Sequence, residues 1–210
     1  MILKGGEREN RIYIIIAVII IVVIIFTIFF STNTLKKAFI EDSFLDDSWF
    51  EDIIERREGS QLFGLENWAS FTYKNDNLSY PAYVTVTSIK LLFMMNEEDL
   101  LEKTEDTIKR ISEQGIFIDI SSRISDKREL KNGHKTTYVI YDGNDTSEEP
   151  SERIKIIGET WNCGNSGTSI ICIGVAQVTD NASNNSKINI VNWERIIGYQ
   201  NGLIYNVKCH

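Results

Sequence analysis

The sequence predicts an α+β protein, with an N-terminal transmembrane helix followed by one domain in which an antiparallel sheet packs against one long helix and a short closing helix. Two observations lead to this class: an uncharged apolar run at residues 12–30, and a helical pattern at residues 97–114 set among segments rich in β-branched residues. The predicted parts are an N-terminal tail at 1–11, the transmembrane helix at 12–30, a juxtamembrane segment at 31–59 and a globular domain at 60–210.

Residues 12–30 contain no charge, proline or glycine. As a helix they would be roughly 28 Å long, close to the thickness of a bilayer core. No small-residue cleavage pattern follows, so the run predicts an uncleaved signal-anchor of a single-pass protein in the cell membrane. Four N-x-S/T triplets, beginning at Asn77, Asn144, Asn181 and Asn184, favour an extracytoplasmic C-terminal domain, since glycosylation requires an exposed position outside.

The juxtamembrane segment shows the signature of a short amphipathic helix. Ser48 and Glu51 fit a capping box, and an apolar stripe follows helical spacing. The stripe comprises Leu45, Trp49, Phe50, Ile53 and Ile54. We expect this face either to pack on the core of the domain or to dock on a partner or membrane surface.

The remaining elements follow from periodicity and turn signals. The helix at 97–114 begins after Asn96 as cap and ends at Gly115, and the segment dense in turn formers at 162–167 predicts a hairpin. The predicted strands lie at 68–73, 82–94, 116–120, 134–141, 153–161 and 168–178, and the closing helix at 191–197.

The succession of the helix at 99–115, the strand at 116–120, the Asn132-Gly133 turn entering a strand, and the strand at 171–178 resembles the general plan of the PsbP-like family. This resemblance covers residues 68–198 and rests on pattern. It implies a fold only, because no functional residue of that family can be matched here.

Charge and composition exclude several functions. With 30 acidic and 22 basic residues the net charge is -8, and no basic cluster interrupts this background, which disfavours nucleic-acid binding. Two histidines and no CxxC spacing leave no visible zinc ligand set. No phosphate-binding loop or GxSxG motif occurs either, and no cofactor is predicted.

Two sets of residues provide candidate chemistry. Cys163 with His134 would form a nucleophilic dyad, since a thiolate needs a nearby base, although a histidine at a strand start is commonly an ordinary structural residue. Asp142, Asn144 and Asp145 place oxygens as at the start of a calcium loop. That loop's glycine and terminal glutamate are missing, so a solvated acidic turn is the alternative.

The three cysteines Cys163, Cys172 and Cys209 allow at most one internal disulfide. A tight turn at 164–167 would leave Cys163 and Cys172 roughly 13 Å apart along the hairpin, too far for a bond. That pair therefore requires a wider loop. Otherwise Cys209 bonds to one of them, or all three remain reduced.

The lack of a catalytic constellation predicts a non-enzymatic binding or envelope-interaction module, tethered to the membrane by one helix and binding an envelope protein. One alternative is a membrane-bound thiol- or cation-dependent hydrolase that uses the candidate residues above. Another is a pilin-like structural subunit, because Lys4-Gly5-Gly6 precedes the apolar run and would be cleaved after Gly6.

Overall fold

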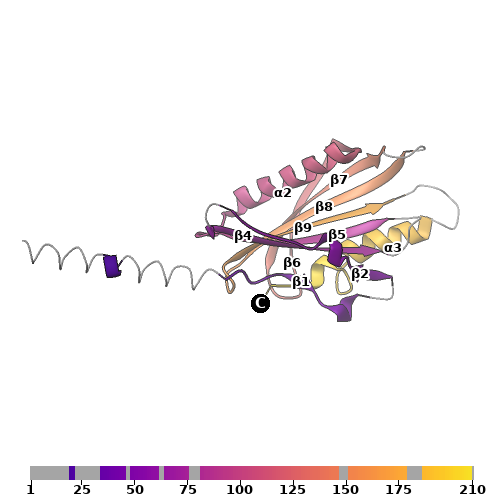
Figure 1. The fold of residues 1–210 in the computed structure, drawn as a ribbon. Helices are drawn as coiled ribbons and strands as arrows, with labels where there is room; N and C mark the ends of the chain where they lie inside the picture. The colour runs from indigo at the N-terminus through magenta and orange to yellow at the C-terminus, as the bar shows by residue number, and fades with distance from the viewer. Residues whose placement is uncertain are drawn as a thin grey trace, which may run out of the picture. The chain divides into compact units, whose positions relative to one another are not determined.

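The computed structural model describes residues 19–21, 34–45, 48–61, 64–75, 81–146, 151–178 and 186–209. The chain divides into two compact units, Met1–Thr34 and Leu35–His210. In the first unit residues 19–21 are helical, and the second unit holds the sheet and the helices drawn in Figure 1.

The predicted transmembrane helix requires correction. Across the described ranges, no helix has both the length and the apolar character needed to span a bilayer. Of residues 12–30 only 19–21 belong to those ranges, and the tail at 1–11 with the cleavage point after Gly6 lies outside them. The predictions of a single-pass signal-anchor, a membrane partner and a cell-membrane location are corrected accordingly. Of the four asparagine triplets only Asn144 is described, and it lies within a strand.

The second unit is built on an eight-stranded antiparallel sheet. The strands lie side by side in the order β2 (Trp49–Glu51), β4 (Glu66–Asn75), β5 (Ala82–Lys90), β9 (Thr168–Gln177), β8 (Glu152–Cys163), β7 (Lys135–Asp145) and β6 (Ile116–Glu129), and β3 (Arg57–Gln61) also pairs with β4. A separate pair joins β1 (Phe39–Ile40) to β10 (Val207–Lys208).

Two α-helices accompany the sheet, α2 (Glu97–Ile111) and α3 (Ser186–Ile197). The Asn96 side chain accepts a hydrogen bond of 2.8 Å from the Asp99 N–H and so caps α2. The 3-10 turn η4 (Ser112–Gln114) continues α2 up to Gly115, whose φ of 94° suits glycine. Other 3-10 turns in the described ranges include η1 (Asp42–Phe44), η2 (Ile53–Glu55) and η5 (Ile204–Asn206).

The central strand β9 is buried along its whole length because both faces of the sheet are covered. Glycines show how closely the helices approach. A Cβ at Gly158 would lie 2.6 Å from Thr104 of α2, and one at Gly174 would lie 2.5 Å from Ile196 of α3. Gly158 and Gly174 belong to the two opposite faces, so α2 and α3 lie on opposite sides of the sheet (Figure 1).

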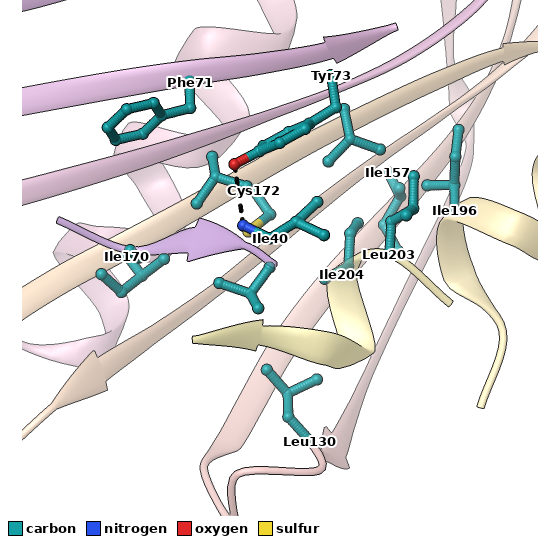
Figure 2. Close-up of a cluster of buried hydrophobic side chains, with 14 of the residues drawn as sticks. Ile40, Phe71, Tyr73, Leu130, Ile157, Ile170, Cys172, Ile196, Leu203 and Ile204 are labelled. Atoms are coloured by element: carbon teal, nitrogen blue, oxygen red, sulfur yellow. Dashed lines mark hydrogen bonds between the residues drawn. The ribbon is translucent and has the colours of Figure 1, made fainter. Parts of the chain in front are cut away.

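The sheet face covered by α3 carries the larger hydrophobic core. This core also includes residues from the first and last segments of the second unit, such as Ile40 and Val207. Ile40 donates its N–H to the Tyr73 hydroxyl at 2.9 Å, and Leu203 and Ile204 are fully buried beside Ile157 and Ile196 (Figure 2). Burial raises the pKa of Tyr73 to about 12. The C-terminal segment is therefore part of the core and not a loose tail.

The predicted α+β class is wrong, because the described fold is predominantly antiparallel β-sheet. In place of the amphipathic helix, residues 49–51 form β2, where Trp49 is buried and Phe50 is exposed. The strand expected at 116–120 continues to Glu129 as an edge strand, whose charged side chains are compatible with solvent. The segment 35–59 also belongs to the same compact unit as the rest of the sheet.

The approach of α2 to the sheet gives a first testable prediction. Gly158→Ala should lower the free energy of unfolding by about 1–3 kcal/mol, because the new methyl group overlaps Thr104 and Ile108. Gly164→Ala is the matched control, since a Cβ there meets nothing within 4 Å. Urea unfolding followed by tryptophan fluorescence measures both, and equal stability of the two variants would contradict the close packing.

Candidate functional site

Three chemically active side chains, His134, Cys163 and Cys209, meet at one end of the sheet. The Cys209 sulfur lies 3.1 Å from His134 Nε2 and 2.8 Å from the Cys163 sulfur. One donor atom from each residue falls within 4.8 Å of the others, and this is the only such group of three or more among the described residues. A closed disulfide would be about 2.05 Å long, so the two cysteines are separate thiols here.

Local structure explains how each residue reaches this position. His134 follows Gly133, whose φ of 81° turns the chain into β7, and its N–H bonds to Asn132 Oδ1 at 3.1 Å. Cys163 is the last residue of β8 and accepts the Gly167 N–H that closes the hairpin turn. The tail carrying Cys209 is held because Asn132 Nδ2 donates to the Val207 carbonyl at 3.0 Å.

The site disfavours an ionised thiol at Cys209. Cys163 and Cys209 are 0% and 1% exposed, and His134 is half-buried. Burial, with a smaller contribution from the neighbouring Cys163 thiol, raises the pKa of Cys209 to about 12. The nearby Trp161 indole N–H has the opposite effect and lowers the pKa of Cys209. This N–H is buried, and among the described residues it makes no hydrogen bond of normal geometry. A catalytic cysteine needs an accessible thiolate, so this arrangement does not favour a thiol hydrolase.

Two of the three cysteines, Cys163 and Cys209, lie in this cluster, and Cys172 lies outside it. Cys163 and His134 do come together. Cys209, which the sequence did not single out for this site, joins them, with its sulfur 3.1 Å from His134 Nε2. Cys172 pairs with Glu159 in the sheet while Cys163 pairs with Thr168, so the hairpin turn is tight and excludes a Cys163–Cys172 bond. Burial also raises the pKa of Cys172 well above its ordinary value.

The acidic candidates do not converge. Asp142, Asn144 and Asp145 follow one another along β7, where alternate side chains point to opposite faces. Lys155 Nζ lies 2.7 Å from an Asp142 oxygen. The three residues therefore do not form a calcium loop within the described part of the chain.

A second feature, absent from the sequence predictions, is an apolar groove between α2 and β6. Its volume is about 390 Å³. Ile108 and Tyr141 are buried at its base, while Phe117 and Ile120 are more than half exposed. The groove is lined by Glu105, Ile108, Lys109, Ser112, Gly115, Ile116, Phe117, Ile118, Ile120, Tyr141 and Thr146.

A bulge in β6 shapes one end of this groove. The pairing with β7 jumps from Asp119 to Ile124, so four residues of β6 oppose one of β7. Ser121 donates both its N–H and its hydroxyl to Asp119, and these hydrogen bonds lower the pKa of Asp119. Arg123 then bonds to Glu105 of α2 at 2.9 and 2.7 Å, which ties the bulge to the helix.

Comparisons with protein-family models, curated proteins and solved structures find no match to this chain. The resemblance to the PsbP-like family therefore stays a prediction.

Proposed function

We propose that the domain is a non-enzymatic binding module, which takes an extended segment of a partner protein along the first half of β6. The observation that supports this most is the apolar groove beside an edge strand. Within the described residues, β6 ends the sheet, and its outer edge pairs with no strand. An edge of this kind can accept a further strand through main-chain hydrogen bonds.

The groove supplies the selectivity that main-chain pairing lacks. Side chains of an added strand alternate between the two faces of the sheet. On the face covered by α2, such a side chain would enter the space next to Ile116 and Ile118. A large apolar side chain fits this space best, because the buried base is formed by Ile108 and Tyr141.

The charges at the rim define the partner further. Arg123 is paired with Glu105, and Lys109 lies 3.1 Å from Asp106, so the local charges balance within the protein. The chain as a whole carries -8. The partner segment should therefore be neutral or basic, with an aromatic or branched aliphatic side chain at its centre.

A peptide experiment tests this function. Selection from a random nonapeptide display library should enrich neutral or basic peptides with a central large apolar residue. Ile120→Glu should weaken their binding about ten- to hundredfold, since it removes one buried isoleucine contact. Ile120 is 67% exposed, so the fold should tolerate the change. Dissociation constants from fluorescence polarisation provide the measurement.

Two controls distinguish binding by strand addition from nonspecific hydrophobic binding. Ile53→Glu alters a residue that is 73% exposed and outside the groove, and it should leave peptide affinity unchanged. The peptide can be N-methylated either at its odd-numbered or at its even-numbered peptide bonds. Only one of these two sets should abolish binding, because a strand presents every second N–H to its neighbour. Equal losses in both protein variants, or no enriched peptide, would refute the proposal.

A further inference from the structure

We infer that His134, Cys163 and Cys209 form a zinc-binding site that fastens the C-terminal tail to the sheet. The sequence contains no local ligand pattern of the CxxC type, and the three residues come from widely separated positions. The fold brings them together from the start of β7, the end of β8 and the segment after β10. Two thiolates and an imidazole form a donor set that suits zinc.

The surroundings support a charged, metal-bound form over a plain pair of thiols. The imidazole of His134 belongs to the cluster through Nε2, at 3.1 Å from the Cys209 sulfur, and a disulfide would make no use of it. The indole N–H of Trp161 is buried without a hydrogen-bond partner among the described residues and lies next to the same sulfur. Such a donor stabilises a thiolate ligand by bonding to it from the second coordination sphere.

Binding requires only a small adjustment and no redox chemistry. With bonds of about 2.3 Å to each sulfur, a tetrahedral zinc ion would hold the sulfurs about 3.8 Å apart. The present separation is 2.8 Å, so the two sulfurs must move about 1 Å further apart to hold the ion. One Zn²⁺ replaces the two thiol protons, which pass to solvent, and the neutral imidazole adds its lone pair. A fourth ligand, such as water, would complete the tetrahedral shell.

A zinc ion at this site would attach the C-terminal segment, which carries Val207 and Cys209, to the sheet. Val207 and Cys209 are buried, and β10 pairs with β1. Zinc would link this segment to β7 and β8 and would raise stability, because the site is assembled only in the folded chain. Removal of the ion should therefore lower the melting temperature and weaken the attachment of the segment around Cys209 to β7 and β8.

The full-length chain refolded with zinc under reducing conditions should retain about one ion per molecule after desalting, measured by elemental analysis. X-ray absorption should show two sulfur ligands at about 2.3 Å and a nitrogen at about 2.0–2.1 Å. Cys209→Ser and His134→Gln should each lose the ion, whereas Cys172→Ala should keep it, because Cys172 is a buried cysteine outside the cluster.

Other outcomes would overturn the inference. Zinc retained by Cys209→Ser would place the ion elsewhere. If the parent chain binds no zinc under reducing conditions, although circular dichroism shows that it is folded, the proposed zinc site is excluded. A disulfide would be identified instead by three results together. The mass of the chain would be lower by two hydrogens, peptide mapping would link Cys163 to Cys209, and the reduced chain would take up no zinc.

Discussion

Replacing Arg128 with methionine is expected to lower the free energy of unfolding by about 3–5 kcal/mol, the usual consequence of removing one member of a buried ion pair. The partner is Glu159, whose side chain is 0% exposed, while that of Arg128 is 7% exposed. The substitution would leave a carboxylate in the core without its counter-charge. Urea unfolding of the parent and the variant measures the difference.

The geometry around Arg128 explains the large effect. Its Nε donates to Glu159 at 2.8 Å, a second guanidinium nitrogen bonds to the other carboxylate oxygen, and a third donates to the Ile197 carbonyl. Tyr138 and Tyr199 lie 5.7 and 5.9 Å from the guanidinium carbon. Burial opposes the charge, but the hydrogen bond and charge of Glu159 outweigh it and raise the pKa of Arg128. One side chain thus joins β6, β8 and the end of α3.

A second variant distinguishes the charge effect from lost packing. The double variant Arg128→Met with Glu159→Met removes both charges and should recover most of the lost stability, since apolar replacements of a buried pair are commonly tolerated. Thr136, which donates to Glu159 at 2.6 Å, would lose that one hydrogen bond, at a cost of about 1 kcal/mol. A double variant as unstable as Arg128→Met alone would show that packing, and not the unpaired charge, causes the loss.

Local signals in the sequence were sufficient for several elements. Asn96 and Gly115 mark the two ends of the helical region comprising α2 and η4, and both perform the capping roles expected from their residue types. The turn formers at 162–167 predicted the hairpin of β8 and β9. Whether its turn was tight or wide, which decides the separation of Cys163 from Cys172, was left open, and the register shows a tight turn. In each case the relevant contacts lie within a few residues of one another.

Other features depended on contacts that a single sequence does not reveal. Trp49 and Phe50 fit both a helical stripe and a strand, and pairing with β4 decided for the strand. The strand predicted at 116–120 was too short, because the charged residues up to Glu129 belong to the same edge strand. The Cys209 contact with His134 spans 75 residues, so no spacing pattern could predict it. The groove likewise arises only when α2 and β6 lie side by side.

The burial of the C-terminal segment leads to a further large effect. Leu203→Ala should lower the free energy of unfolding by about 2–5 kcal/mol, because Leu203 is 0% exposed and its removal leaves a cavity beside its neighbours under α3. Its N–H also donates to the Arg195 carbonyl at 2.8 Å, so the backbone around it is fixed and cannot easily close over the gap. Equilibrium unfolding in urea again provides the measurement.

Asn201→Ala is the matched control for this segment, since Asn201 is exposed only two residues away and should change stability by less than about 0.5 kcal/mol. Hydrogen exchange adds a regional measurement. If the C-terminal segment is part of the cooperative core, Leu203→Ala should lower amide protection in β9 as well as in residues 203–208. A loss confined to the final residues, with β9 still protected, would show that the segment opens independently of the sheet.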